Sequence, residues 1–529
     1  MDKNKLLWQA DLENGYYKNP ILFTDYSDPD VIRVGDTFFM TASSFNCVPG
    51  LPVLVSKDLV SWEICNYGVT HLPFETYDSP AHGKGIWAPS IRYHHNKYWI
   101  FVGMPDEGIF MTHTEDPFGE WCPLICIWSG KGFIDPCPFW DEDGKAYIVH
   151  AYAKSRIGFQ SKLGLLPMSQ DGTKCIGEDR FIFDGSKTQP TIEGPKVYKR
   201  GKYYYIFAPA GGVATGWQTV LRSTSIYGPY EEKIVMHQGS TEVNGPHQGG
   251  LVDTPNQEEW FVHFQDKGVY GRIVHLQPVR WKNDWPIIGE NPNEESIGKP
   301  VLKYKKPSGC QAVEPTEPET SDDFQEGRLG LSWQWLANPK ENYYSMNERK
   351  GYLRLYAVNP NNIANDVLYN CGNVLTQKIA APDFEMVTKI DVSQLKVGTK
   401  SGVTVFGMSY AYVAIIKKEE DVYLQYVTSQ GKDEDIKENL QWEKKIQLDQ
   451  DANIWFKINF NKTEKCQFST SVDGVKYNQT TDYFTPSQGK WVGAKIGLFA
   501  LNEKLTNSES YIDVEYVKFM RDELELCNV

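Results

Sequence analysis

Three acidic residues occupy similar short motifs, although long stretches of chain separate them. Asp28 lies in SDPD, Asp135 in IDPC and Glu193 in IEGP. Carboxyl groups that lie close together raise one another's pKa, so that one of them can hold a proton near neutral pH. A protonated carboxyl beside an ionised one suits hydrolysis of a glycosidic bond, because one donates a proton to the leaving oxygen while the other activates water or attacks. Glutamate suits the donor role, since its longer side chain reaches further.

Two other roles exist for such acids. A single Asp in a loop often caps a turn by accepting a hydrogen bond from a backbone N–H. A group of acids can also bind Ca²⁺, although Ca²⁺ usually recruits backbone carbonyls or Asn and Gln as well. The recurrence of the acids at equivalent positions of a repeat favours the catalytic interpretation.

The elements that must position these acids form an internal repeat. Each unit has a head residue, small or proline residues, a short β-rich run, a turn such as GD, DGK or RGK, and a second β run rich in aromatic residues. The five units are residues 27–44, 87–104, 134–152, 192–210 and 247–265, with head residues Asp28, Trp87, Asp135, Glu193 and His247. A period of roughly 50 residues made of strands is typical of a β-propeller. We therefore predict an all-β fold in which residues 1–306 form a five-bladed β-propeller that brings the heads together at one end of its channel.

The second half of the chain predicts a different all-β domain. Residues 307–320, PSGCQAVEPTEPET, contain little apolar content and several Pro steps, which indicates a linker. Residues 321–529 contain short alternating strands and Gly, Asn or Asp turns, with no helical period of useful length. This pattern favours a jelly-roll, concanavalin-like β-sandwich.

Composition excludes several classes of partner. The formal net charge of −14 argues against nucleic acid, which needs a basic surface. No apolar run is long enough to predict a membrane span. Residues 1–17 lack the apolar centre of a signal peptide, so we expect either a cytoplasmic protein or one whose export signal has been removed. Cys122 and Cys126 have no second Cys or His pair at matching spacing, which disfavours a zinc site.

The ordered motifs SDPDVI, IDPCPFWDEDGKAY and IEGPKVYKRGKYYYIFA resemble those of glycoside hydrolase family 43, an inverting family built on a five-bladed propeller. The resemblance covers the whole propeller and implies a role for each acid. Asp28, which precedes Pro29, matches the general base. Asp135 matches the acid that orients the donor and tunes its pKa, and Glu193 matches the general acid. Asp25 and Asp30 lie near the base, but neither occupies its motif position.

The same resemblance suggests residues that bind substrate. Arg272, in GRIVHLQPV, resembles an arginine that contacts sugar hydroxyls in the family, and its alternative is a surface salt bridge. Trp87 is either a wall on which a sugar stacks or a core residue. Phe45 and Trp217 are further stacking candidates. His247 resembles a histidine that in parts of the family places Ca²⁺ or water on the axis, but we assign no metal and no cofactor.

The sequence therefore predicts an exo-acting, inverting glycosidase that releases terminal pentoses from plant-derived oligosaccharides or from hemicellulose and pectin side chains. The sequence around APAGGVATGWQTV resembles the branch of the family with α-L-arabinofuranosidase and β-D-xylosidase activities. Of the two sugars, we slightly favour arabinofuranosyl as the one released. The alternatives are β-xylosidase as the main activity and a carbohydrate-binding propeller without catalysis. A fructan- or sucrose-cleaving hydrolase is disfavoured because its Asn-Asp-Pro-Asn, Arg-Asp-Pro and Glu-Cys blocks are absent.

Overall fold

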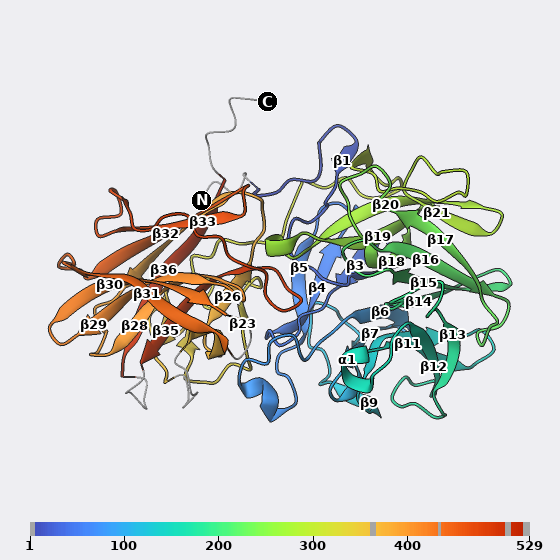
Figure 1. Ribbon diagram of the computed structural model, residues 1–529, viewed down its shortest axis with the longest axis horizontal. Helices are drawn as coiled ribbons and strands as arrows, with labels where there is room; N and C mark the ends of the chain where they lie inside the picture. The colour runs from blue at the N-terminus through green and yellow to red at the C-terminus, as the bar shows by residue number, and fades with distance from the viewer. Residues whose placement is uncertain (1–5, 360–366, 432–434, 503–508, 522–529) are drawn as a thin grey trace.

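The chain folds into two β-rich bodies that lie side by side (Figure 1). A computed structural model describes residues 6–359, 367–431, 435–502 and 509–521. The N-terminal body, coloured blue to green, is a propeller, and the C-terminal body, coloured yellow to red, is a sandwich. The predicted order of the two folds along the chain is confirmed.

The propeller consists of five antiparallel sheets, each made of four consecutive strands. Their order along the chain gives five blades, as the repeat predicted. Blade 1 contains β2 (Asp30–Val34), β3 (Thr37–Thr41), β4 (Gly50–Ser56) and β5 (Glu63–Val69), and blade 2 contains β6 (Pro89–His94), β7 (Lys97–Met104), β8 (Gly108–Thr114) and β9 (Ile125–Ser129). Blade 3 contains β10 (Phe133–Trp140), β11 (Ala146–Tyr152), β12 (Lys162–Met168) and β13 (Arg180–Asp184). Blade 4 contains β14 (Lys196–Arg200), β15 (Tyr203–Ala210), β16 (Trp217–Ser223) and β17 (Glu231–His237), and blade 5 contains β18 (His247–Asp253), β19 (Glu259–Asp266), β20 (Arg272–Lys282) and β21 (Trp285–Ile288).

The first strands of the blades line the central axis. β2 contacts β6, β6 contacts β10, β10 contacts β14, and β18 contacts β2. The second strands are almost continuously buried, as in the KYWIFVGM run of β7, because both of their faces pack against neighbouring blades. Each head residue precedes the first strand of its blade or lies within the first three residues of that strand, so the fold delivers all five to the same end of the channel.

The ring is closed by a segment that comes before the first blade. Leu22 forms a bridge with Val274 on β20, and the Tyr17 hydroxyl donates a hydrogen bond of 2.8 Å to the Leu276 carbonyl. β1 (Tyr16–Lys18) pairs with β22 (Lys303–Lys305), which follows blade 5. Because every blade is complete from its own strands, these contacts join the two ends of the ring without a blade shared between them.

The sandwich consists of two seven-stranded antiparallel sheets. The first has the order β23 (Gln334–Trp335), β26 (Leu375–Lys378), β35 (Lys495–Asn502), β28 (Thr399–Phe406), β29 (Ala411–Lys418), β30 (Asp421–Gln430) and β31 (Lys437–Ile446). The second has the order β24 (Tyr344–Ser345), β25 (Leu353–Tyr356), β36 (Tyr511–Met520), β27 (Phe384–Asp391), β32 (Asn453–Asn461), β33 (Lys465–Ser471) and β34 (Asn478–Gln479).

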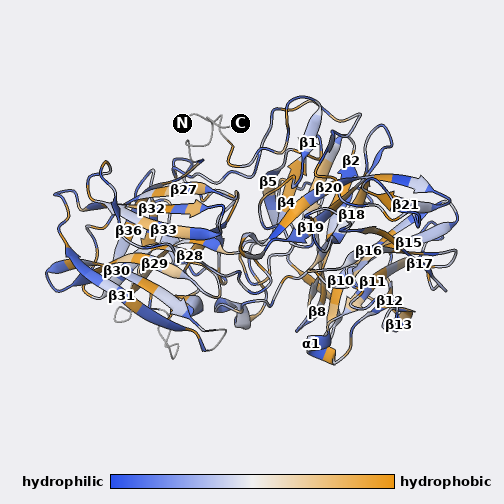
Figure 2. Ribbon diagram, turned by 45° about the horizontal axis from the view of Figure 1, so that its top comes forward, coloured by the Kyte–Doolittle hydropathy of each residue, from blue (hydrophilic) through white to orange (hydrophobic). Residues whose placement is uncertain are grey.

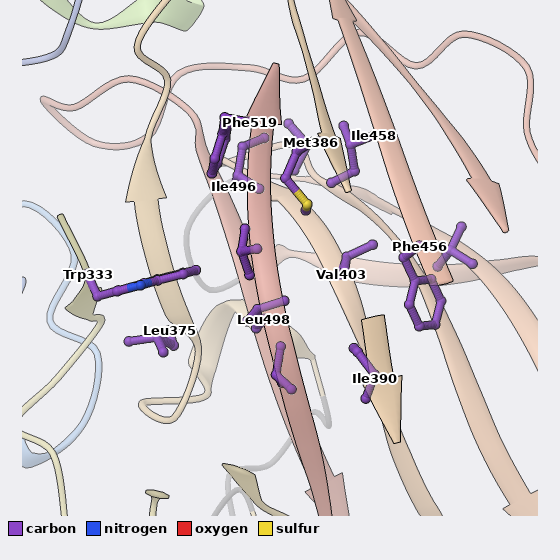
Figure 3. Packing of buried hydrophobic residues seen from close by; sticks show 14 of the residues in the cluster. Trp333, Leu375, Met386, Ile390, Val403, Phe456, Ile458, Ile496, Leu498 and Phe519 are labelled. Atoms are coloured by element: carbon purple, nitrogen blue, oxygen red, sulfur yellow. The ribbon is translucent and has the colours of Figure 1, made fainter. Parts of the chain in front are cut away.

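Apolar side chains from both sheets meet in the centre of the sandwich. Figure 3 shows Val403 and Leu498 of one sheet with Met386 and Phe456 of the other, all of them buried. Strands such as β32, NIWFKINFN, alternate buried and partly exposed residues, because one face packs on this core and the other meets solvent. The same alternation appears as orange and blue steps along the strands in Figure 2.

The two bodies share a packed boundary. Val48 and Trp335 exchange two backbone hydrogen bonds of 3.0 and 2.7 Å. These bonds join the loop between β3 and β4 of blade 1 to the sandwich. Phe23 and Tyr270 of the propeller belong to the same buried apolar cluster as the sandwich core. The predicted linker runs along the propeller, where the Ser308 N–H donates to Glu258 and both carboxylate oxygens of Glu317 accept from the N–H groups of residues 7 and 8.

Helices among the described residues are short: η1 (Glu75–Asp78), α1 (Lys154–Ile157), η2 (Gly268–Tyr270) and η3 (Leu368–Asn370). None of them is long and apolar enough to cross a membrane. The bounds 1–306, 307–320 and 321–529 stay a prediction, and residues 1–5 and 522–529 lie outside the described residues.

Candidate active site

The acidic heads stand on sharply turned backbone. Asp28 and Asp135 have φ angles of 55° and 56°, and Gly194, which follows Glu193, has a φ of 59°. A positive φ is uncommon for a residue other than glycine, and such strain gathers at functional sites. At Asp135 the pairing of β10 with β11 also shifts between Ile134 and Cys137, so the strand bends where the acid leaves it.

Asp28 is buried and held by three donors. Its Oδ2 accepts hydrogen bonds of 2.6 Å from the Ser27 hydroxyl and 2.5 Å from the Ser43 hydroxyl. Its Oδ1 lies 3.2 Å from Nη1 of Arg272, and that same nitrogen donates to the Ser27 hydroxyl at 2.7 Å. Each of these contacts presents a hydrogen-bond donor to the carboxyl group or to the serine that holds it, so the position of Asp28 is fixed.

The pKa of Asp135 depends on both of the other acids. Burial, then the carboxylates of Glu193 and Asp28, raise the pKa of Asp135 to about 8, while the Gly194 N–H donates to its Oδ2 at 2.8 Å. A buried carboxyl next to two others loses its proton last, because charging it costs desolvation and like-charge repulsion. The structure therefore brings the three sequence-predicted acids together.

Glu193 differs from its neighbours in exposure. Its side chain is 36% exposed, whereas Asp135 is 4% exposed. Its Oε1 lies 2.9 Å from Nε2 of His247, the buried head residue of blade 5. Of these two acids, Glu193 is the one that a molecule in the channel mouth can touch.

Arg272 is buried and does not form a surface salt bridge. Its backbone N–H donates to Asp25 at 2.9 Å, and its guanidinium carbon lies 4.8 Å from the centre of the Phe264 ring. The same carbon lies 5.9 Å from the centre of the Trp491 ring. The arginine is thus fixed beside Asp28 with an aromatic residue on either side.

Trp87 is partly exposed at the head of blade 2. Its indole N–H donates to the Gly83 carbonyl at 3.0 Å, which fixes the ring. Phe45, with a φ of 52°, is buried and packs edge-on against Trp87 with the ring centres 6.4 Å apart. Phe45 thus supports the Trp87 ring from behind.

Trp217 stands further from the acids. Its indole N–H donates to Gln189 at 2.8 Å, and its ring packs against the apolar cluster that contains Ile192, the neighbour of Glu193. Among the described residues, no hydrogen bond, ion pair or ring contact joins Trp217 to any of the three acids. Its part in substrate binding stays a prediction.

Two acids near the base have other partners. Asp30 is fully buried, and its Oδ2 accepts from Arg92 at 2.6 Å and from the Ile91 N–H at 2.9 Å. Asp25 accepts from the Arg272 N–H and, at 2.9 Å, from the Gly493 N–H of the sandwich. Asp30 therefore ties blade 1 to blade 2, and Asp25 ties the two bodies together.

The sequence reasoning missed Trp491, which the sandwich contributes. Its ring centre lies 6.2 Å from that of Trp87, and the side chain is about half exposed. A tryptophan between glycines in the stretch GKWVGA, outside any strand, was the available signal. It could not be assigned to the site, because only the docking of the two bodies brings it there.

The described residues contain no group of three or more His, Cys, Asp or Glu side chains arranged to hold a metal ion. His247 turns Nε2 towards Glu193, while its Nδ1 is buried with no hydrogen-bond partner among the described residues. One nitrogen does not make a calcium site, because Ca²⁺ takes six to eight oxygen ligands. No catalytic step is therefore assigned to a metal.

Comparisons with known proteins agree with this geometry. The sequence profile of glycosyl hydrolases family 43 matches residues 17–286, and that of the β-xylosidase C-terminal concanavalin A-like domain matches residues 321–520. A protein of Xylanibacter ruminicola that carries a provisional β-xylosidase name is 38% identical over 92% of this chain and 87% of its own length. A β-xylosidase of Formosa agariphila is 31% identical over 98% of this chain and 93% of its own length.

A third relative and a solved structure extend the comparison. The non-reducing end α-L-arabinofuranosidase of Bacteroides ovatus is 30% identical over 68% of this chain and 69% of its own. The crystal structure of the family 43 protein BlXynB from Bacillus licheniformis superimposes with a TM-score of 0.81 at 26% identity, covering 96% of this chain and all of that one. With its five blades, its three converging acids and these matches, the chain belongs to glycosyl hydrolases family 43 and is a glycosidase.

Proposed function

We propose that the protein releases terminal pentoses from the non-reducing ends of oligosaccharides, with inversion at the anomeric carbon. Asp28 deprotonates the attacking water, Glu193 protonates the leaving oxygen, and Asp135 tunes the proton on Glu193. The single observation that carries the proposal is the contrast between Glu193, whose side chain is partly exposed, and Asp28, which is buried and held by Ser27 and Ser43. Membership of an inverting family supports the stereochemistry.

The position of the proton supports this division of labour. In the free enzyme the raised pKa belongs to Asp135, which is buried. Carboxyl groups that lie close together share protons, and the carboxylate of Glu193 is one of the two that raise the pKa of Asp135. Asp135 can therefore act as the reservoir that keeps one proton in the site until the leaving oxygen arrives.

Closure of the mouth by the sandwich supports exo action. Trp491 lies against both Arg272 and Trp87, so it covers the propeller end next to the proposed base. A site walled on that side accepts the end of a chain more readily than its middle. Nη1 of Arg272 lies only 3.2 Å from Oδ1 of Asp28, so a sugar whose hydroxyls contact the arginine lies close to the proposed base. Such a short separation suits a small sugar.

The names of the relatives support the choice of sugar. Two relatives that match more than nine-tenths of this chain carry β-xylosidase names, and a third is an α-L-arabinofuranosidase. We therefore propose β-D-xylosyl as the first substrate to test and α-L-arabinofuranosyl as the second. Plant-derived hemicellulose or pectin side chains remain the proposed source of both.

Initial rates on 4-nitrophenyl β-D-xyloside and 4-nitrophenyl α-L-arabinofuranoside test the sugar, with Glu193→Ala as the control for the site. Proton NMR of the first sugar released from xylobiose tests the stereochemistry, and we expect α-xylose. Retention of the β configuration would contradict the roles given to Asp28 and Glu193. Binding of xylobiose without product after long incubation would instead indicate a carbohydrate-binding propeller.

A further inference from the structure

An arginine that the sequence analysis did not single out lies against Trp87. The Arg156 guanidinium carbon lies 5.2 Å from the centre of the Trp87 ring. Arg156 belongs to α1, the short turn that leads from β11 to β12 in blade 3. Neither the repeat nor the family resemblance pointed to this residue.

Arg156 is held in place by an acid from another blade. Its Nε and Nη2 donate to Oδ1 and Oδ2 of Asp106 at 3.2 and 3.1 Å, so a planar fork meets a planar carboxylate. Asp106 lies in the turn between β7 and β8 of blade 2. The pair fixes the plane of the guanidinium, because both of its contacts must be kept at once.

The fixed guanidinium keeps hydrogen-bonding capacity. Arginine has five N–H donors, and the hydrogen bonds of Arg156 to described residues use one on Nε, one on Nη2 and one on Nη1, which donates to Ser155 at 2.8 Å. One N–H on each terminal nitrogen is left. The side chain is 18% exposed, so these donors are presented from a rigid, partly desolvated group.

A series of contacts links Arg156 to the arginine beside the proposed base. Arg272 contacts Asp28, Trp491 lies against Arg272, Trp87 lies against Trp491, and Arg156 lies against Trp87. Arg156 is thus two aromatic rings away from the arginine beside the proposed base. For a sugar bonded to a pentose that lies on Arg272 and Trp491, the next side chains in this series of contacts are Trp87 and Arg156.

We propose that Arg156 and Trp87 form the binding site for the leaving-group sugar, with Trp87 as the stacking face and Arg156 as the donor to neighbouring ring hydroxyls. The inference rests on the proposed function, because it needs a glycosidic bond cleaved beside Glu193. Its consequence is selectivity: the site favours an oligosaccharide over a simple aryl glycoside, whose leaving group offers no ring hydroxyls. A hydroxyl-binding site discriminates in this way because its donors are left unpaired when the hydroxyls are missing.

The test measures kcat and KM for xylobiose and for 4-nitrophenyl β-D-xyloside. Arg156→Ala is expected to lower kcat/KM for xylobiose about tenfold more than for the aryl xyloside, mainly through KM. Arg156→Lys keeps the charge but loses the fork, so we expect a loss in the same direction of roughly half that size on a logarithmic scale. If Arg156→Ala fails to fold, the lysine variant carries the test.

The chain provides a matched control. Arg33 also forms a forked pair, with Asp253 at 3.2 and 2.6 Å, but it lies next to the turn at the opposite end of blade 1. Arg33→Ala should leave the ratio of the two kcat/KM values unchanged. Binding of xylobiose by Glu193→Gln, with and without Arg156→Ala, should show the same tenfold weakening by titration calorimetry.

Equal losses on both substrates, or unweakened binding in the Glu193→Gln background, would overturn the inference and leave Arg156 as a structural tie between blades 2 and 3. A wild-type enzyme that cleaves neither xyloside would remove the proposed function and this inference together. A wild-type enzyme that is active but whose substrate ratio ignores Arg156 would remove the inference alone.

Discussion

The axis of the propeller and the core of the sandwich are buried to a similar degree but differ in what they bury. A cluster of buried apolar side chains fills the centre of the sandwich, and Figure 3 draws part of it. The propeller axis instead buries Asp28, Asp135 and Arg272, and deeper in it Lys196 and the pair of Asp30 with Arg92. Buried charges contribute little net stability, because desolvation offsets their attraction, whereas apolar burial stabilises in proportion to area. The comparison indicates that the sandwich core serves stability and the propeller axis serves chemistry.

The sharpest test of this division compares variants of Glu193 and Asp28 on two substrates whose leaving groups differ in their need for a proton. Glu193→Ala should lower kcat/KM for xylobiose about 10³- to 10⁴-fold but much less for 4-nitrophenyl xyloside, because nitrophenolate leaves without a proton. Asp28→Asn should lower both by a similar factor of about 10³, since every substrate needs the activated water. Steady-state kinetics on the two substrates make this comparison.

An exposed acid of blade 3 serves as the control for these variants. Glu142 is 85% exposed and pairs with Lys199, so Glu142→Ala should leave both rates within about twofold of wild type. If Glu193→Ala lost the same factor on both substrates, the donor role would have to move to another residue.

A core substitution in the sandwich should give the opposite profile. Phe456 is fully buried between the two sheets, so Phe456→Ala should lower the free energy of unfolding by about 3–5 kcal/mol. The kcat of the folded fraction should change little, because Phe456 lies in a layer that does not reach the proposed site. Urea unfolding followed by tryptophan fluorescence, with activity measured per folded protein, tests this prediction.

Tyr483 of the same body is 56% exposed, so Tyr483→Ala is the matched control and should unfold at nearly the wild-type urea concentration. A large loss of kcat in folded Phe456→Ala would show that the sandwich core also serves the chemistry.

The repeat made most of the propeller predictable from sequence. Each head residue is followed by the same hairpin pattern, so equivalent positions, and with them the meeting of Asp28, Asp135 and Glu193, could be derived without a structure. The difference between Asp28 and Asp30 could not be derived from strand alternation, which places residues two apart on the same face. The φ of 55° at Asp28 breaks the alternation and sends one acid to Arg272 and the other to Arg92.

The walls of the site were less predictable because they depend on docking. Trp491 reaches Arg272 only through the boundary between the two bodies, where Gly493 donates to Asp25. Arg156 reaches Trp87 only because Asp106 of another blade holds it. No periodicity marks either residue, since each sits in a loop whose direction is set by tertiary contacts.

Trp491 lies where the two bodies meet, so a substitution there tests whether the sandwich also takes part in binding substrate. Trp491→Ala should raise KM for xylobiose about tenfold, with a loss of kcat no larger than about threefold, because it removes an apolar wall and no reacting group. Its melting temperature should stay within a few degrees of wild type, since the side chain is about half exposed. Trp491→Phe keeps an aromatic face and should recover most of the binding.

If Trp491→Ala left KM unchanged, the sandwich would have no part in binding substrate, and the comparison between the two bodies would become simpler. If instead it lowered the melting temperature strongly, its main role would be to fasten the boundary near Gly83 and Trp87.

The smallest effect concerns the cost in stability of the propeller's buried acids. Because burial and two neighbouring carboxylates raise the pKa of Asp135 to about 8, the folded protein holds a proton that the unfolded chain releases near pH 4. Between these values the folded state binds more protons than the unfolded state, so Asp135 makes stability fall as pH rises. Asp135→Asn keeps an oxygen that can accept from Gly194 but has no proton to lose, so its melting temperature should exceed that of wild type by about 3 °C at pH 9 and match it near pH 4.

Asp143 provides a control of opposite sign. Hydrogen bonds from the Lys145 side chain and backbone lower the pKa of this exposed carboxyl, so Asp143→Asn should lower stability slightly above pH 4 and leave it unchanged in stronger acid. Thermal unfolding from pH 2 to 9 distinguishes the two slopes, because Asp143 titrates below pH 4 and Asp135 above it. Parallel curves for wild type and Asp135→Asn would mean that Asp135 is ionised like an ordinary surface acid, and the proton used at Glu193 would then have to come from solvent.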